Sequence, residues 1–154
     1  MTPFLWFNGQ AEEAVTFYCS VFENAETVSI TRYGPGGPGP EGGVMAATFR
    51  LLGQEFIALD GGPQFTFSPA VSFMVVCDTQ AEIDHLWEKL GEGGKPNVCG
   101  WLDDRFGLTW QIVPGVLGTM LQDKDRERAG RVMRAMMQMA KIDIAGLERA
   151  RAGE

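Results

Sequence analysis

Histidine and cysteine are scarce in this sequence. It holds one histidine, His85, and three widely spaced cysteines, Cys19, Cys77 and Cys99. No two cysteines stand in a CxxC spacing, so neither a zinc knuckle nor a disulfide framework is predicted. Cysteines within apolar strand or helix patterns usually act as small buried hydrophobic residues. This cysteine usage predicts a reduced, cytoplasmic protein.

Basic residues and long apolar runs are also scarce. Lysine and arginine number 13 against 20 aspartates and glutamates, which gives a formal net charge of -7. Phosphate binding needs clustered lysines and arginines, so the charge argues against a nucleic-acid partner and against anionic membrane surfaces. No apolar run approaches membrane-spanning length, and no signal-peptide pattern opens the sequence. We therefore expect neither a nucleic-acid nor a membrane partner.

Two stretches of the chain repeat one order of elements. An apolar segment at 3–8 precedes Gln10-Ala-Glu12 and an amphipathic helix, and a second at 70–77 precedes Gln80-Ala-Glu82 and another helix. Strand-like segments then follow in each half, at 28–33, 44–52 and 55–60, and near 97–99, 100–103 and 109–113. Such internal repetition identifies the architecture before any single residue does. It predicts an α+β fold of two βαβββ modules that form a half-open, barrel-like sheet.

The modules have predicted limits and caps. Module 1 covers about 3–62 and module 2 about 70–114, within a single domain of residues 1–154. Asn8 is a candidate cap for the first helix, and Asp78 or Thr79 for the second. The stretch 34–43, GPGGPGPEGG, is predicted to be a long surface loop, with a mobile flap over a ligand site as the alternative.

Residues 115–154 predict a helical C-terminal extension. Its apolar face is rich in methionine and comprises Val132, Met133, Met136, Met137, Met139 and Ala140. A methionine stripe at helical spacing is usually a packing surface. Because this stripe lies outside the two modules, we consider packing on the partner subunit of a homodimer as well as packing within the chain.

Four segments carry a resemblance to a known family. They are PFLWF at 3–7, SFMVVCDTQAEIDHLWEKL at 72–90, CGWLDDRFGLTWQIVP at 99–114 and AMMQMAKIDIAGLERA at 135–150. Together they resemble the vicinal oxygen chelate superfamily, which includes glyoxalase I and bleomycin-resistance proteins. The local match is to its PhnB-like branch, often labelled 3-demethylubiquinone-9 3-methyltransferase domain, and it covers nearly the whole chain.

The resemblance implies a metal site that the residues do not support. Superfamily enzymes hold a divalent metal with His or Glu side chains from strands of both modules. The matching positions here are Pro3 and Ile57 in module 1, and a position between Val71 and Phe73 together with Gln111 in module 2. None supplies a good metal ligand, and the lone histidine lies in the middle of a predicted helix. We therefore expect no metal and no cofactor.

The methyltransferase label has little support in the residues. A Rossmann-type methyltransferase needs alternating strands and helices and a glycine-rich turn that leads from a strand into a helix. The glycine-rich stretch at 34–43 precedes a predicted strand instead.

We therefore predict a metal-free cavity that binds a small apolar or aromatic molecule, for sequestration or resistance. The predicted lining residues are Leu5, Phe7, Ile57, Leu59, Phe73, Trp101 and Gln111. The alternative is that these side chains fill the core. Asp103 and Asp104 are interpreted as turn-stabilising rather than as an acid–base pair.

Two other functions remain open. One is an enzyme, either glyoxalase- or dioxygenase-like with a non-standard metal site, or a methyltransferase. The other is a structural dimerisation module without a ligand.

Overall fold

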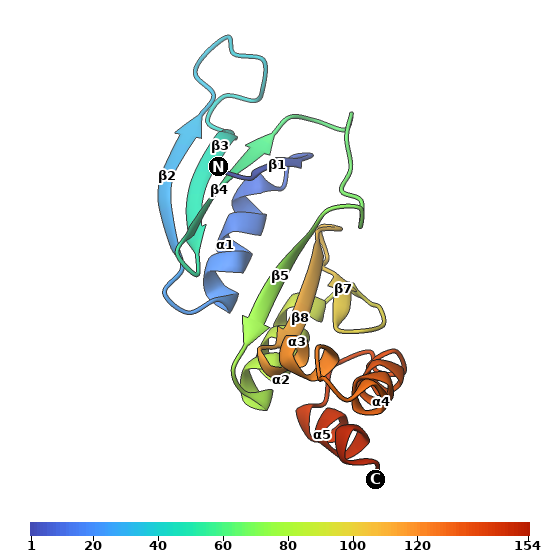
Figure 1. Cartoon of the computed structure of the whole chain (residues 1–154). Helices are drawn as coiled ribbons and strands as arrows, with labels where there is room; N and C mark the ends of the chain where they lie inside the picture. Colours follow the sequence, from blue (N-terminus) through green and yellow to red (C-terminus); the bar gives the residue numbers. More distant parts are fainter. The chain divides into compact units, whose positions relative to one another are not determined.

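The computed structural model describes residues 1–154 and divides them into two units, Met1–Phe67 and Ser68–Glu154 (Figure 1). This boundary lies between the two predicted modules. Each unit is described separately below.

The first unit has the predicted βαβββ order. It consists of β1 (Phe4–Phe7), α1 (Ala11–Val21), β2 (Glu26–Arg32), β3 (Val44–Leu51) and β4 (Gln54–Asp60). The strands lie in the order β1-β4-β3-β2, and the β1–β4 pair is parallel whereas the other pairs are antiparallel. A parallel pair needs a long crossover connection, and α1, β2 and β3 lie between these two strands in the chain.

The predicted cap of α1 is wrong. The N-cap residue is Gln10, not Asn8, and its side chain makes no capping bond. The backbone N–H of Ala11 instead donates to Oδ1 of Asp60, at 3.0 Å. The parallel register pairs Phe7 with Asp60, so the end of β4 reaches the start of the helix. A carboxylate at the positive helix end is favourable.

The 34–43 stretch connects the antiparallel strands β2 and β3. Tyr33 N–H donates to Gly43 O, and Gly42 N–H donates to Tyr33 O, both at 2.9 Å. A Cβ on Gly39 would lie 2.3 Å from the Tyr33 ring, so the loop requires glycine where it passes this ring. The prediction of a loop is confirmed, and the flap alternative stays a prediction.

The second unit repeats the same order. It consists of β5 (Ser72–Cys77), α2 (Gln80–Gly91), β6 (Lys95–Pro96), β7 (Trp101–Asp103) and β8 (Thr109–Pro114), in the sheet order β5-β8-β7-β6. The pair β5–β8 is parallel, as β1–β4 is in the first unit. Thr79 forms a capping box with Glu82, which confirms one of the two predicted caps. The predicted repeat is therefore present in the fold.

The strand expected near 97–99 is wrong. The short strand β6 ends at Pro96, and both Cys99 (φ 61°) and Gly100 (φ 81°) have left-handed backbones. Their N–H groups donate to the carbonyls of Met139 and Ala140, at 2.7 and 2.8 Å. This segment therefore bonds to the C-terminal extension.

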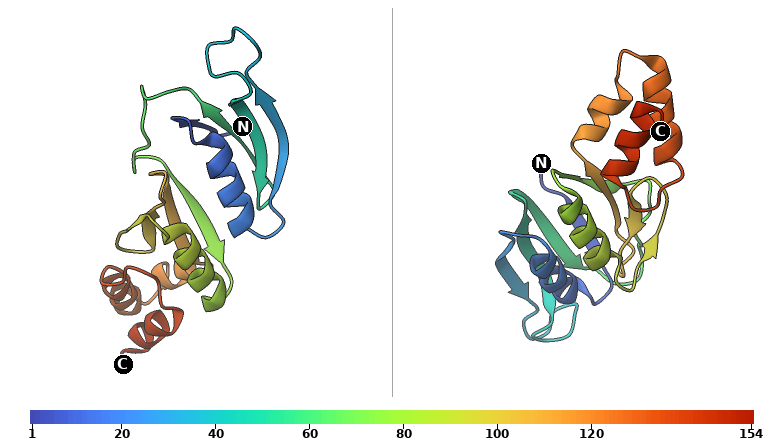
Figure 2. Two further views of the ribbon diagram at one scale, coloured as in Figure 1. Left: turned by 180° about the vertical axis from the view of Figure 1, so that it is seen from behind. Right: turned by 90° about the horizontal axis from the view of Figure 1, so that it is seen from below.

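The extension forms three helices on the second unit, α3 (Val116–Leu121), α4 (Arg126–Met136) and α5 (Ile144–Ala152) (Figure 2). Its core consists of Leu117, Met120, Val132, Ile142 and Leu147, with Met136 and Met139 among the residues packed against it. That part of the methionine face packs within the chain, so packing on a partner is the wrong interpretation for it. Met133 and Met137 are exposed, at 41% and 57%.

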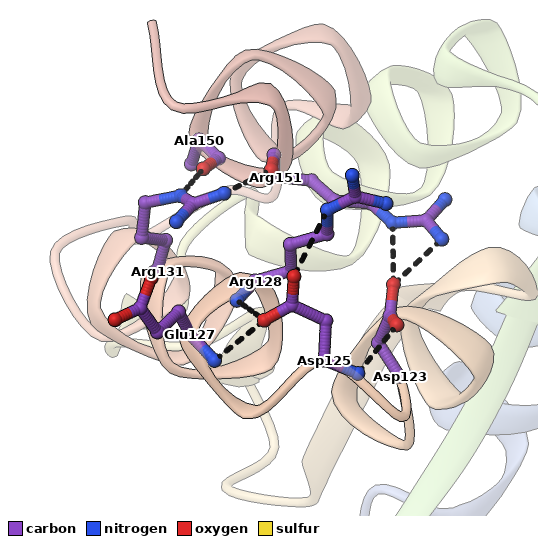
Figure 3. Close-up of polar contacts among 7 residues, drawn as sticks. All are labelled: Asp123, Asp125, Glu127, Arg128, Arg131, Ala150 and Arg151. Carbon is purple, nitrogen blue, oxygen red and sulfur yellow. Dashed lines mark hydrogen bonds and ion pairs between the residues drawn. The ribbon is translucent and has the colours of Figure 1, made fainter.

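Polar contacts join α4 and α5 (Figure 3). Arg131 donates to the carbonyls of Ala150 and Arg151 at the end of α5, at 2.9 and 2.7 Å. Arg151 in turn donates twice to Oδ2 of Asp123, at 3.0 and 2.7 Å. Cations at a helix C-terminus complement its dipole. No helix of the chain is both long and apolar enough to cross a membrane.

Candidate functional site

Strand alternation gives the first sheet a face covered by α1 and a second face, which we call the first open face. Leu5 pairs with Ala58, and both are buried, as is Phe7. Successive side chains of a strand point to opposite faces. Ile57 and Leu59 therefore lie on the first open face, beside Phe4 and Trp6, with which they pair.

The predicted lining residues of the first unit consequently divide between two faces. Leu5 and Phe7 belong to the layer under α1, whereas Ile57 and Leu59 can contact a ligand on the open side. The prediction placed all four residues on one wall, but the pairing of β1 with β4 puts Leu5 and Phe7 on the face opposite to Ile57 and Leu59.

The second sheet divides in the same way. Phe73 pairs with Trp110, with ring centroids 5.8 Å apart, on the face that also carries the buried residues Leu102 and Ile112. Gln111 pairs with Met74 on one side and with Trp101 on the other. Of the three predicted residues in this unit, Gln111 and Trp101 therefore share the uncovered face, and Phe73 does not.

We call this uncovered face the second open face. Alternation and the strand pairings assign to it Ser72, Met74, Val76, Trp101, Asp103, Thr109 and Gln111, whereas Val113 at its edge packs against the core of the C-terminal extension. Met74 and Val76 are 61% and 55% exposed. An exposed apolar patch with a few convergent polar groups is typical of a small-molecule site.

The polar groups of the second open face are linked in two pairs. Gln111 Nε2 donates to Ser72 Oγ at 2.8 Å, and Thr109 Oγ1 donates to Asp103 Oδ1 at 2.6 Å. The register places Asp103, Thr109 and Ser72 side by side across three strands. The sequence analysis did not select Ser72, Thr109 or Asp103 as site residues. Alternation along one strand could have indicated Thr109, two residues before Gln111, whereas Ser72 and Asp103 join the face through the strand register.

Asp104, which follows Asp103 in the chain, has a different role. Asp104 is only 3% exposed. Its Oδ1 accepts from the N–H groups of Phe106 and Leu108, and its Oδ2 accepts from the Trp110 indole, at 2.9 to 3.0 Å. The turn-stabilising interpretation is confirmed for Asp104, whereas Asp103 lies on the open face.

Aromatic rings gather on the first open face. The Trp6 indole N–H donates to Gly62 O at 2.8 Å, and Phe65 packs edge-on against Trp6 at 5.0 Å between centroids. A Cβ on Gly61 would lie 2.3 Å from the Trp6 ring, so this approach requires glycine. Trp6 and Phe65 thus place two aromatic rings, packed edge to face, on this open face.

The donor set does not fit the metal site that the resemblance implies. The ladders make Ile57 and Gln111 equivalent, each opposite a residue of the first strand of its unit, Phe4 and Met74. Ile57 N–H also donates to Pro3 O at 3.0 Å, which confirms that Pro3 and Ile57 are neighbours. Within residues 1–154, no group of three or more His, Cys, Asp or Glu side chains is arranged to hold a metal ion.

With this geometry established, comparison with known proteins identifies the family. The family described as 3-demethylubiquinone-9 3-methyltransferase matches residues 1–113. The chain belongs to this family. The match ends at Val113, so the resemblance of the C-terminal segment to the family stays a prediction.

Solved structures support the same assignment. A PhnB protein from Bacillus cereus, provisionally described as a 3-demethylubiquinone-9 3-methyltransferase, is 44% identical with a TM-score of 0.71. The match covers 75% of this chain and 98% of that one. Protein PA1353 from Pseudomonas aeruginosa is 24% identical over 74% of this chain and 96% of its own, with a TM-score of 0.62.

The fosfomycin resistance protein FosX from Mesorhizobium loti has the same fold as this chain. It is 14% identical over 80% of this chain and 96% of its own, with a TM-score of 0.60. At this identity the likeness shows a shared fold alone. No curated protein matches the chain.

Proposed function

We propose that this PhnB-like protein binds a small, largely apolar or aromatic molecule on its open faces, without the metal ligands of its superfamily. The single observation that supports this most strongly is the state of Gln111. It occupies the position of an expected metal ligand, its amide is bonded to Ser72, and its strand neighbours are Met74 and Trp101. A neutral amide among apolar side chains favours an uncharged ligand.

The proposed contacts are the open-face members of the predicted set, Ile57, Leu59, Trp101 and Gln111. Leu5, Phe7 and Phe73 support these contacts from the opposite faces of the sheets. We also propose a cytoplasmic homodimer. Met133 and Met137, the exposed part of the methionine face, are the first candidates for the contact between copies. Size-exclusion chromatography with light scattering tests the dimer.

Tryptophan fluorescence tests the binding proposal. We expect 1-methylnaphthalene, a neutral aromatic probe, to quench the wild-type emission, and Trp101→Phe to lose a large part of that response. Trp87→Phe is the matched control, because Trp87 lies on α2 rather than on an open face. Equal responses from both variants, or no quenching of the wild type, would contradict the proposal. Metal analysis should accompany the titration, since a stoichiometric ion would favour an enzyme.

An enzyme is the second candidate function, and the family description favours it. Methyl transfer has little structural support here, because the 34–43 stretch is a β2–β3 loop and does not lead from a strand into a helix. Calorimetric titration with S-adenosylmethionine decides this point. We expect no heat of binding, and micromolar binding would restore methyl transfer as the function.

A further inference from the structure

A groove lies at the end of α2, on the side of the second sheet opposite to the second open face. Its volume is about 480 Å³, within the range of small-molecule sites. Pro96 pairs with the buried Leu102 across β6 and β7, so both belong to the face that α2 covers. The lining residues come from the last turns of α2, its C-cap and these two strands: Trp87, Glu88, Lys89, Gly91, Glu92, Pro96 and Leu102.

Apolar side chains and one glycine shape this groove. Trp87 is partly exposed and Pro96 is exposed, so both can contact a ligand. A Cβ on Gly91 would meet only the Leu102 side chain, at an ordinary contact distance of 3.9 Å. The space beside Gly91 is therefore open and forms part of the groove.

The charge of the groove is negative on balance. Glu88 and Glu92 stand one helical turn apart, and the exposed Glu92 side chain forms no ion pair or hydrogen bond. The one ammonium group, on Lys89, lies 3.9 Å from Glu88 Oε1. Lys95 pairs with Asp103 and so belongs to the opposite face of the sheet. The Glu92 carboxylate and the negative end of the α2 dipole thus remain to attract a cation.

We infer that this groove binds a small organic ammonium ion. The positive group lies beside the Trp87 ring, where cation–π attraction adds to that of the Glu92 carboxylate, and the apolar part of the ion contacts Pro96. A hydroxyl on the ligand can accept from the Trp87 indole N–H. This site lies apart from the open faces and does not depend on the function proposed for them.

Three probes of nearly one shape test the inference on the full chain. They are choline, a cation; 3,3-dimethylbutan-1-ol, its neutral isostere; and 3,3-dimethylbutanoate, an anion. Titration of isotope-labelled protein followed by NMR gives the affinity and the location of binding together. We expect choline to bind at least about fivefold more tightly than the alcohol, and the anion to bind most weakly. Choline should shift the signals of the Trp87 indole and the Gly91 amide, and Trp87→Phe assigns the indole signal.

Substitutions connect that preference to the groove. Glu92→Gln removes the carboxylate that has no partner, so choline should weaken several-fold while the alcohol keeps its affinity. Gly91→Leu should fill the groove and weaken both probes; the glycine there has no left-handed φ, and leucine favours a helix. Glu148→Gln is the charge-matched control, because Glu148 is an exposed residue of α5. It should leave all affinities unchanged, and circular dichroism should show each variant folded.

The possible results decide the charge preference and the location separately. If choline and the alcohol bind equally, or if the anion binds best, the preference for a cation is refuted. If no probe shifts the Trp87 and Gly91 signals, the groove is not a ligand site. A choline affinity unchanged in both Glu92→Gln and Gly91→Leu would place the binding elsewhere and overturn the assignment. None of these results bears on the open faces, whose probe is neutral and aromatic.

Discussion

The side chain of Gln80 should fix the C-terminal extension to the second unit, and its removal should loosen the extension. Gln80 is the first residue of α2. Its Nε2 donates to Ile142 O at 3.0 Å, and its Oε1 accepts from Ile144 N–H at 2.9 Å. One amide thus bonds both sides of the turn into α5, and the second bond occupies a donor at the start of that helix that lacks an intrahelical partner.

The expected loss follows from these contacts. A hydrogen bond contributes roughly 0.5 to 1.5 kcal/mol, and a donor or acceptor left buried without a partner costs about 1 to 3 kcal/mol. The two bonds are only partly buried, so water can replace them in part. We expect Gln80→Ala to lower the free energy of unfolding by about 2 kcal/mol. Alanine is tolerated at a first helical position, so helix propensity should not mask the effect.

The repeat supplies a matched control. Gln10 is the counterpart of Gln80 in the sequence repeat and is the N-cap residue of α1, where its side chain is exposed and makes no capping bond. Gln10→Ala should therefore change the free energy of unfolding by less than about 0.5 kcal/mol. Urea unfolding followed by circular dichroism gives both values. Hydrogen exchange should show faster exchange of the Ile144 amide in Gln80→Ala. Equal losses in the two variants, or an Ile144 amide as protected as in the wild type, would refute the reasoning.

Three further outcomes are expected. Asp104→Ala leaves three donors without their buried acceptor, and urea unfolding should show a loss of at least about 3 kcal/mol. The hydrogen bonds from Arg151 and the ion pair with it hold the pKa of the Asp123 carboxyl below its usual value. This pair therefore stabilises the fold above about pH 4 and is lost as the pH falls through the folded-state pKa, so stability measured from pH 6 to 2 should fall less steeply in Asp123→Asn than in the wild type. Burial raises the pKa of the Cys77 thiol to about 11, so titration with a thiol reagent at pH 8 should modify the other two cysteines first.

The repeat was predictable from sequence because it depends on patterns that local physics enforces. Ala14, Phe17, Tyr18 and Val21 recur in the sequence at the spacing of one helix face, and all four residues are buried on α1. The turn between β3 and β4 is equally local, since Leu52 and Gly53 have the positive φ values, 48° and 80°, that a two-residue hairpin of this kind needs. Such features depend on a few neighbouring residues.

The errors arose where a distant segment supplies the bonding partner. Asp60 caps α1 because β4 pairs in parallel with β1, and nothing near Asn8 in the sequence indicates it. A strand was expected near 97–99, but the C-terminal extension accepts from the Cys99 N–H, while the N–H groups of Asn97 and Val98 donate to acceptors within the same turn. The prediction of the candidate site has a different difficulty. Its seven residues lie on two opposite faces of their sheets rather than on one. The strand register, which the sequence does not give, joins Ser72 and Asp103 to Gln111 and places Phe73 on the opposite face.

The junction with the extension also explains why two similar modules differ. Gln10 and Gln80 begin matching segments of the sequence. Only the Gln80 side chain forms hydrogen bonds to the C-terminal extension, because the extension follows the second unit alone. A Cβ on Gly100 would lie 2.6 Å from Ile112 O and 3.1 Å from the Ile142 side chain, so β8 and the extension together require glycine there. Gln80 and Gly100 both lie within the region that the family match covers, whereas the helices that they hold lie beyond it. The extension is therefore bonded to family positions of the second unit, so a substitution at either position should disturb α5 while leaving the first unit intact.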